Sequence, residues 1–211
     1  MQTIVCVGTG PSLKREQLDV ARARGWPLYV CNDAIRWAPD AALLTACNWQ
    51  WWDRRWPEVR DLPCEKWTTR RESADKYGLR WIAERPCDGS GLSNDPAFLY
   101  HGHGSGYQLL GLAWRARPAR IVLLGYDLTY APDYDGRQQF AGSAPRHFFG
   151  EYEPALQHWP SVRVERGRHV ELLGFYADVA RQRPCEIVNC SGGVLECFPR
   201  AEIGDLDGSR H

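Results

Sequence analysis

The sequence has no excess of charge of either sign, and it contains few lysines. Its 211 residues include 26 basic and 26 acidic side chains, so the formal net charge is zero. The only lysines are Lys14, Lys66 and Lys76. A neutral chain lacks the broad positive surface by which proteins bind nucleic acids or anionic membranes. We therefore expect no tight binding of duplex nucleic acid.

Long apolar runs, a leader segment and paired cysteine motifs are also lacking. No apolar run approaches the roughly 20 residues that a membrane-spanning helix needs, and no signal peptide precedes the first apolar run, near residue 3. None of the eight cysteines belongs to a Cys-x-x-Cys pair, so the sequence does not favour zinc. Four cysteines lie inside or at the ends of apolar runs, as buried, reduced thiols usually do: Cys6, Cys31, Cys47 and Cys190. We expect a cytoplasmic protein without disulfides.

Short apolar runs, rich in Val, Ile, Leu and Cys, alternate with helical patterns. Runs of this length without polar alternation are typical of strands covered on both faces of a parallel sheet. The predicted strands are 3–8, 27–32, 42–47, 120–126 and 185–190, and the predicted helices are 12–24, 105–117 and 166–182. This order predicts a doubly wound α/β fold with a mainly parallel, Rossmann-like sheet.

Two stretches depart from this alternation. Residues 84–104 are rich in Gly, Ser, Asp, Asn and Pro, which predicts a loop. Residues 128–160 contain aromatic, charged and proline residues without periodicity, over more length than an ordinary connection needs. We interpret 128–160 as an irregular lid region of a single nucleotide-binding α/β domain, residues 1–203. Residues 204–211 are predicted to be a polar tail.

The first predicted strand runs directly into a glycine corner, Gly8-Thr9-Gly10-Pro11-Ser12. Glycines allow a tight turn and a close approach of the backbone to a ligand, and proline suits the first turn of a helix. The N–H groups of a helix start, together with the Ser12 hydroxyl, favour an anion. The corner therefore predicts phosphate binding, although a plain strand-to-helix turn without a ligand has the same pattern.

Polar residues also stand at the ends of the other predicted strands. Ligands of open α/β sheets bind beyond the carboxyl ends of the strands, where amides and hydroxyls can recognise base, ribose and phosphate. A second glycine-rich helix entry, residues 102–106, adds a candidate cap and anion site. The alternative is that such residues only terminate strands. The candidate ligand contacts are Asn32, Asn48, Gly104, Ser105, Asp127, Asn189 and Ser191.

Five blocks of the sequence match the pattern of a known family. Residues 7–13 are similar to its Gly-Asn-Gly-Pro-Ser-Leu opening, residues 30–32 to an Arg-Cys-Asn strand end, and Asn48 to an asparagine that ends the third strand. Residues 105–127 are similar to a Ser-Gly-helix-strand-Gly-Ile-Asp segment, and residues 147–150 to His-Tyr-Ile-Gly. By these blocks the chain resembles the bacterial lipo-oligosaccharide sialyltransferases. Phage-encoded uncharacterised proteins and archaeal-type pterin pyrophosphokinase-like proteins share the first and fourth blocks.

The resemblance implies nucleotide binding, with a cytidine monophosphate sugar as the donor. The residues that it places against base, ribose and phosphate are Thr9, Asn32, Asn48, Gly104 and Ser105. Thr9 stands in place of the family's asparagine. The family's tyrosine pair, which steadies the leaving phosphate, is not at the same spacing, and Tyr130 and Tyr134 are the nearby substitutes. No histidine stands at residues 150–151, where the family's catalytic histidine would fall.

A sugar transfer needs a base for the acceptor hydroxyl and a group that neutralises the departing phosphate. His147 is the first candidate for the base, because histidine titrates near neutral pH, and Glu151 is the second. Asp133 and Asp135 form an Asp-x-Asp pattern that can hold Mg²⁺ or Mn²⁺. The sialyltransferases that the chain resembles need no metal.

These patterns favour a glycosyltransferase that binds a CMP- or UDP-type sugar and transfers the sugar to an unknown acceptor. Two alternatives stay open: a Mg²⁺-dependent pyrophosphokinase or nucleotidyl transferase, and a non-catalytic phage protein that binds a nucleotide or sugar. In each case the expected partner is a small-molecule nucleotide, and a phage-encoded protein would act in the host cytoplasm.

Overall fold

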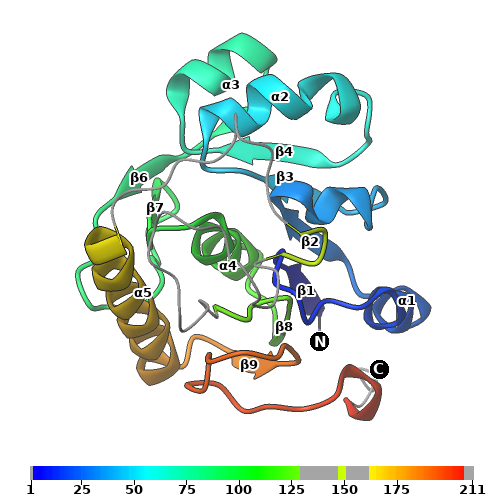
Figure 1. Ribbon diagram of the computed structural model, residues 1–211, viewed down its shortest axis with the longest axis vertical. Helices are drawn as coiled ribbons and strands as arrows, with labels where there is room; N and C mark the ends of the chain where they lie inside the picture. Colours follow the sequence, from blue (N-terminus) through cyan, green and yellow to red (C-terminus); the bar gives the residue numbers. More distant parts are fainter. Residues whose placement is uncertain (1, 129–146, 151–161, 207–211) are drawn as a thin grey trace.

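A parallel sheet of seven strands forms the centre of the protein. The computed structural model describes residues 2–128, 147–150 and 162–206, with the side chains of 162–170 excepted. Every neighbouring pair of strands is parallel, in the order β5-β4-β3-β2-β1-β8-β9 (Figure 1). The strands are β1 (Thr3–Val7), β2 (Leu28–Cys31), β3 (Leu43–Thr45), β4 (Glu65–Thr68), β5 (Arg80–Trp81), β8 (Arg120–Leu124) and β9 (Glu186–Asn189). The predicted Rossmann-like sheet is confirmed.

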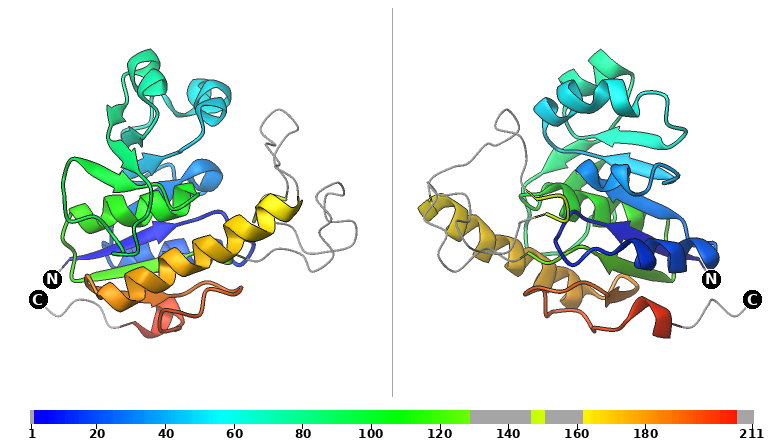
Figure 2. Two further views of the ribbon diagram at one scale, coloured as in Figure 1. Left: turned by 90° about the vertical axis from the view of Figure 1, so that its left-hand side faces the viewer. Right: turned by 45° about the vertical axis from the view of Figure 1, so that its right-hand side comes forward.

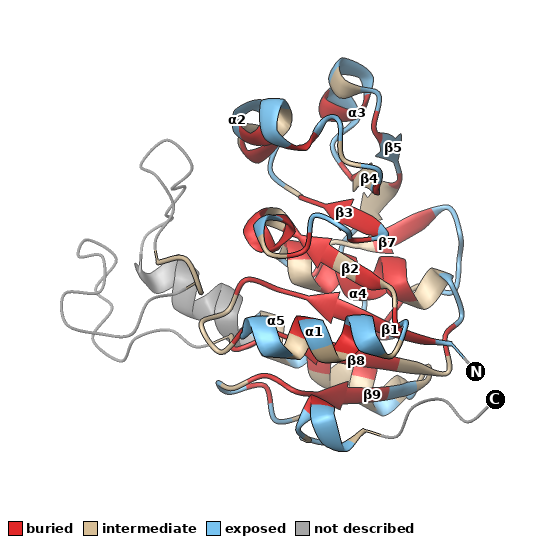
Figure 3. Cartoon of the chain, turned by 90° about the vertical axis from the view of Figure 1, so that its right-hand side faces the viewer, coloured by how far each residue is buried: buried red, intermediate tan, exposed pale blue. Residues whose placement is uncertain are grey.

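Helices cover both faces of this sheet, as a doubly wound fold requires (Figures 1 and 2). One face carries α1 (Arg15–Ala23), the 3-10 helix η1 (Asn32–Arg36), α2 (Trp49–Val59) and α3 (Arg71–Tyr77), and the other carries α4 (Ser105–Arg115) and α5 (Val162–Gln182). In β1, Val5 and Val7 face the first helix layer, whereas Ile4 and Cys6 face the second. Every residue of β1 is buried, which is why no polar alternation marks this strand (Figure 3).

The three predicted helices are present, with ends that lie within four residues of their predicted limits. α1 begins at Arg15 and not at residue 12, because residues 10–13 form a turn in which the Leu13 N–H donates to the Gly10 carbonyl. α4 begins at Ser105 as predicted and ends at Arg115. α5 begins at Val162, four residues before its predicted start. Because α1 begins only at Arg15, the first glycine corner, residues 8–12, does not directly adjoin the N-terminus of α1.

The prediction of a loop over residues 84–104 was wrong for two short segments. β6 (Ala83–Arg85) and β7 (Phe98–Tyr100) pair in parallel and form a small second sheet. Strands of three residues are too short to produce a recognisable apolar run. β4 and β5, short strands near one edge of the main sheet, were not predicted either, nor were α2, which precedes β4, and α3, which lies between β4 and β5.

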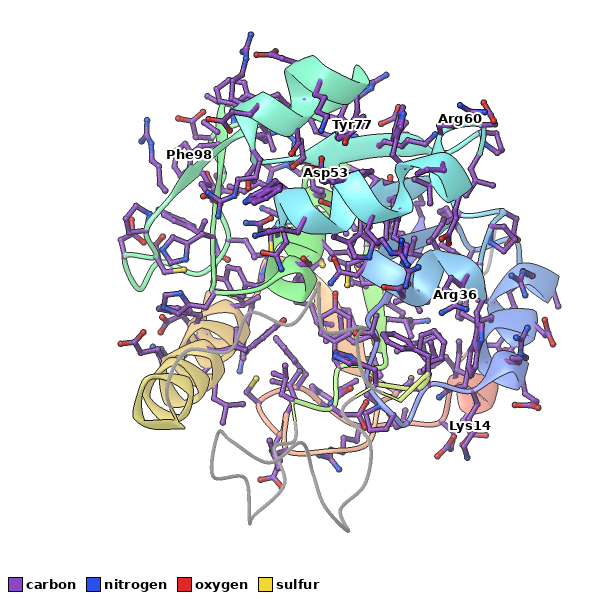
Figure 4. All side chains as sticks on the ribbon, turned by 45° about the horizontal axis from the view of Figure 1, so that its top comes forward. Lys14, Arg36, Asp53, Arg60, Tyr77 and Phe98 are labelled. Atoms are coloured by element: carbon purple, nitrogen blue, oxygen red, sulfur yellow. The ribbon has the colours of Figure 1, made fainter. Side chains whose placement is uncertain are left out.

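α2 and α3 are fastened to each other by a polar and an aromatic contact. The Tyr77 hydroxyl donates to Asp53 Oδ1 over 2.5 Å, and Lys76 Nζ lies 3.0 Å from the same oxygen. Figure 4 shows Asp53 and Tyr77 close together on their two helices. The hydrogen bond from Tyr77 lowers the pKa of Asp53, and Trp56 packs on the Tyr77 ring with 4.8 Å between centroids.

The fold extends a few residues past its predicted end. The 3-10 helix η3 (Ile203–Asp205) packs Ile203 into the first helix layer. The Arg24 guanidinium donates to the carbonyls of Ile203 and Gly204, at 2.7 Å in each case. Residues 204–206 of the predicted tail therefore belong to the fold, and residues 207–211 lie outside the described part, as does the predicted lid apart from Leu128 and 147–150.

All eight cysteines lie within the described residues, and none of them forms a disulfide. Cys6, Cys31 and Cys190 are buried as predicted, whereas Cys47, which lies just after β3, is only partly buried. Among the helices that the structure describes, none is long and apolar enough to cross a membrane.

Replacing Gly174 by alanine is expected to stabilise the protein. Gly174 is an exposed residue of α5 at which an added Cβ would meet no atom within 4 Å. Alanine favours a helix over glycine by about 1 kcal/mol, which corresponds to a rise of roughly 2–4 °C in Tm for a chain of this size. Thermal unfolding measures the change. Gly111→Ala in α4 is the matched control, because its Cβ would lie 3.1 Å from Leu99 and no gain is expected there.

Candidate functional site

The switch point of the sheet lies between β1 and β8. From β1 the chain first builds the strands on one side, β2 to β5, and later those on the other side, β8 and β9. Ligands of such sheets bind beyond the carboxyl ends of the strands at this point. Because all neighbouring strands are parallel, the segments that follow β1, β2, β3, β8 and β9 meet at one edge. The predicted polar strand ends thus share one side of the molecule.

Asp127 fills the first glycine corner from inside the protein. Its carboxylate accepts hydrogen bonds from the Ser12 hydroxyl at 2.8 Å and from the Ser12 N–H at 3.2 Å. The Gly192 N–H in turn donates to the Ser12 hydroxyl at 2.8 Å. A Cβ on Gly10 would lie 2.0 Å from Asp127 Oδ2, so only glycine fits beside this carboxylate. A phosphate at this corner would therefore have to displace Asp127.

The first corner thus has a structural role in this state of the protein. A Cβ on Gly8 would lie 2.5 Å from the Gly125 carbonyl oxygen, so Gly8 allows the ends of β1 and β8 to approach closely. The pKa of Asp127 is raised above its ordinary value because burial disfavours the charged form, and the hydrogen bonds from Ser12 offset only part of this effect. The glycine pattern that predicts a phosphate site here is equally what this internal contact needs. Gly8, Gly10, Ser12 and Asp127 stay predictions as ligand contacts.

Asn189 and Ser191, at the end of β9, use their polar atoms inside the fold. Asn189 Nδ2 donates to the Leu195 carbonyl at 2.7 Å, and Asn189 Oδ1 accepts from the Ser191 N–H at 3.0 Å. The Ser191 hydroxyl accepts from the Tyr126 N–H at 2.8 Å. Both residues are buried. These contacts hold the segment after β9 against β8.

The second glycine-rich helix entry, residues 102–106, is called the second glycine corner below, and three predicted residues meet at it: Asn32, Asn48 and Ser105. The Ser105 hydroxyl lies 3.2 Å from Asn32 Oδ1, and it accepts from the Cys47 N–H at 3.1 Å. The start of α4 is thereby joined to the ends of β2 and β3, and Asn48 follows directly on Cys47 with an exposed side chain. Ser105 was expected to cap α4, but Gly104 is the N-cap residue. The Ser105 hydroxyl bridges to the strands instead.

The start of α4 keeps the capacity to bind an anion. The first N–H groups of a helix have no acceptor within the helix, and the helix dipole adds a positive potential there. Gly104 has an extended backbone, and an added Cβ would meet nothing within 4 Å. Asn32 has a positive φ of 50°, an uncommon conformation that is often found at functional sites. This second corner is therefore the candidate phosphate site.

His147 is held beside Thr9 at the end of β1. Its Nδ1 lies 2.9 Å from the Thr9 hydroxyl, and the Phe148 N–H donates to the Thr9 carbonyl at 3.0 Å. Phe148 packs on Trp37, with 4.0 Å between ring centroids, and His147 stacks on Phe149. The structure thus brings together two predicted residues that are 138 positions apart in the chain. The other predicted residues of this region, Tyr130, Asp133, Tyr134, Asp135 and Glu151, lie outside the described residues.

Sequence reasoning missed a polar cluster next to the second corner. It consists of Thr69, Arg70, Glu84 and Gln108, which come from the end of β4, from β6 and from α4. Arg70 was missed because β4, the strand before it, has no apolar run that predicts a strand. Glu84 was missed because it lies in the segment 84–104, for which the sequence predicts a loop. Across the described residues, no group of three or more His, Cys, Asp or Glu side chains is placed to hold a metal ion.

The carboxyl edge of the sheet thus holds an internally filled corner, a helix start that can take an anion, and an oriented histidine. Asn32 and Ser105 surround the helix start, and Thr9 holds the histidine. Searches against family models, curated proteins and solved structures found no match to this chain.

Proposed function

We propose that this protein is a glycosyltransferase-type enzyme that binds a nucleotide-activated sugar and transfers the sugar to an acceptor hydroxyl. The observation that carries the proposal is the meeting of Asn32, Ser105 and the start of α4 at the carboxyl edge, on the same edge as the Thr9–His147 pair. The blocks that resemble the sialyltransferases fall on these same residues.

The nucleotide is expected to lie across the ends of β1, β2 and β3. Its phosphate would bind at the start of α4, where N–H groups and the helix dipole favour negative charge. The side-chain amides of Asn32 and Asn48 each offer a donor and an acceptor, which suit ribose hydroxyls and the edge of a CMP- or UDP-type base. Specific polar groups of this kind determine how a ligand is oriented in its site.

His147 would act as the base in the transfer. The imidazole takes the proton of the acceptor hydroxyl while the acceptor oxygen bonds to the anomeric carbon of the sugar. The bond from that carbon to the phosphate oxygen breaks, and the nucleotide leaves with the electron pair. The Thr9 hydroxyl engages Nδ1 and so orients the ring for proton transfer at Nε2. Glu151 as an alternative base and Tyr130 and Tyr134 as partners of the leaving phosphate stay predictions.

Cytidine and uridine nucleotides are expected to stabilise the protein in a manner that depends on Gly104. At 100 times Kd a ligand adds about 2.7 kcal/mol, which raises Tm by roughly 5–10 °C in a chain of this size. Gly104→Asp should abolish this shift, because it puts a carboxylate where the phosphate would bind. Gly104→Ala is the matched control and should keep the shift, because a methyl group carries no charge and accepts no hydrogen bond. Asp suits an N-cap, and a Cβ at this position would meet no atom within 4 Å, so the fold should tolerate both side chains.

Thermal unfolding with CMP, UMP and AMP measures these shifts. The absence of a shift with any nucleotide, or an equal shift in Gly104→Asp and the parent protein, would overturn the proposal. Tight binding without turnover of any nucleotide sugar would favour the non-catalytic alternative. Mg²⁺-dependent consumption of ATP would favour the pyrophosphokinase.

A further inference from the structure

Arg70 lies beside the second glycine corner, on the far side of Cys47. The residue follows β4 and immediately precedes α3. Its Nε donates to the Cys47 carbonyl at 3.1 Å, while the N–H of the same Cys47 donates to the Ser105 hydroxyl at 3.1 Å. A single residue, Cys47, therefore connects the guanidinium to the start of α4. The Arg70 side chain is 47% exposed, so a ligand at this edge can reach it.

A chain of polar contacts connects Arg70 through Glu84 to the buried side chain of Gln108. Its Nη1 lies 3.5 Å from Glu84 Oε1, and Glu84 Oε2 accepts from the Thr69 hydroxyl at 2.8 Å and from Gln108 Nε2 at 3.0 Å. The exposed fraction falls from 47% for the Arg70 side chain to 26% for that of Glu84 and 2% for Gln108. Such a buried support restricts the orientations that the guanidinium can adopt.

The same cluster contains a buried acceptor whose hydrogen-bonding capacity is unused. A carboxylate can only accept, so the contact with Glu84 fixes Nε2 of Gln108 on the Glu84 side. Gln108 Oε1 is buried, and no group of the described residues donates to it. Buried polar atoms in folded proteins are normally paired, and an exception calls for an explanation. Gln108 is in the first turn of α4, so its unused acceptor adjoins the helix start. The acceptor calls for a donor, such as a sugar hydroxyl of the ligand, because an anionic group has no hydrogen to donate to it.

The guanidinium still has donors to offer. Hydrogen bonds and ion pairs within the described part engage Nε and Nη1 but not Nη2. Arginine presents its N–H groups in a planar fork that matches phosphate and carboxylate groups. The hydrogen bond from Nε to the Cys47 carbonyl and the contact with Glu84 orient the guanidinium, and because the Glu84 contact is 3.5 Å long and partly exposed, a ligand phosphate can share the guanidinium with it. Arg70 is therefore a positioned cation next to a helix start that also favours negative charge.

We infer that Arg70 binds a second anionic group of the ligand whose first phosphate lies at the start of α4. This inference rests on the proposed function and narrows the substrate class. The second anion is either the outer phosphate of a nucleoside diphosphate sugar or the carboxylate of an acidic sugar on a nucleoside monophosphate. A neutral sugar on a nucleoside monophosphate offers no such group.

The test compares ligands that differ by one anionic group. Calorimetry gives Kd for CMP, CDP and inorganic pyrophosphate with the parent protein and with Arg70→Gln. Loss of hydrogen bonds to a charged group weakens binding by roughly 10- to 150-fold, which we expect for CDP and pyrophosphate. CMP should change by less than about twofold. Arg71→Gln is the matched control, since Arg71 is the adjacent arginine, 64% exposed and 3.1 Å from Asp75 on its own helix.

A second arm separates the two sources of the anion. If Arg70→Gln weakens a CMP-linked acidic sugar and leaves a UDP-linked neutral sugar unchanged, the carboxylate is the partner, and the reverse result identifies the phosphate. Equal loss of CMP and CDP, or no change with any ligand, would overturn the inference while nucleotide binding by the parent protein upholds the proposed function. If neither nucleotide nor pyrophosphate binds the parent protein, both fail. Unchanged Tm values of the two variants show that folding is not the cause.

Discussion

Replacing Arg55 by alanine is expected to lower the free energy of unfolding by about 3–5 kcal/mol, because it leaves a buried charge without its partner. Asp33 is fully buried, and its Oδ1 lies 3.0 Å from Arg55 Nε. The contact is an ion pair between two shielded groups, since the Arg55 side chain is 10% exposed and that of Asp33 is not exposed at all. The Trp51 indole N–H donates to the other oxygen, Oδ2, at 2.9 Å. Asp33 thus depends on two residues of α2.

Chemical denaturation or thermal unfolding measures this loss, which corresponds to a fall of roughly 6–20 °C in Tm. Arg22→Ala is the matched control. Arg22 pairs with Asp40 at 2.7 Å, but both side chains are partly exposed, and such pairs contribute about 1 kcal/mol or less. Similar losses in the two variants would contradict the interpretation that burial makes the Asp33 pair important.

The Arg55–Asp33 pair also supports the candidate site. Asp33 directly follows Asn32, which has a positive φ after β2. Arg55 belongs to α2, whose N-cap residue is Asn48 at the end of β3. The ion pair thereby fastens together the two segments that carry the candidate nucleotide contacts. A substitution that weakens this ion pair without removing it should raise the Kd for the nucleotide while the protein stays folded.

Replacing His147 by alanine is expected to reduce kcat by about 10²- to 10⁴-fold, the usual contribution of a general base. The affinity for the nucleotide should change little, because the candidate phosphate contacts lie at the start of α4. Thr9→Val keeps the shape of the side chain and removes its hydrogen bond to Nδ1. One hydrogen bond contributes about 0.5–1.5 kcal/mol, so a loss of roughly 2- to 13-fold is expected from this variant.

Turnover of a nucleotide sugar together with nucleotide affinity distinguishes the roles. A large fall in affinity in His147→Ala would make the histidine a binding residue. Unchanged turnover would exclude it as the base and direct attention to Glu151, the second candidate. If His147 is the base and Thr9 orients it, kcat should be lowest for His147→Ala, intermediate for Thr9→Val and highest for the parent protein.

The parts of the fold that the sequence predicts are those buried on both sides. β1 and β8 are almost wholly buried, so an uninterrupted apolar run marks each of them. β4 and β5 contain exposed residues and few apolar ones, and their sequence resembles that of a loop. The tryptophans of α2 illustrate why its pattern was hard to interpret: Trp52 is fully buried, whereas Trp49 is 52% exposed.

The site was predictable as an edge of the sheet but not as a set of contacts. Strand ends follow from the apolar runs, and parallel pairing brings them to one side. Asp127 occupies the corner at Ser12 although the two residues are 115 positions apart in the chain. This contact depends on tertiary packing, which a local sequence pattern does not predict. The same holds for the approach of His147 to Thr9. Arg70 escaped notice because the strand that positions it has no apolar signature.

The place of β1 in the sheet has a consequence for synthesis of the chain. Thr3 pairs with Arg120, so one neighbour of this first strand emerges from the ribosome more than a hundred residues later. At about 5–20 residues per second, that interval lasts roughly 6–23 seconds. During this time an apolar strand of Ile, Val and Cys has an open edge that nascent chains of the same polysome can pair with. Slower translation or crowded polysomes should therefore cost yield of soluble product, even though the finished protein has this strand at its centre.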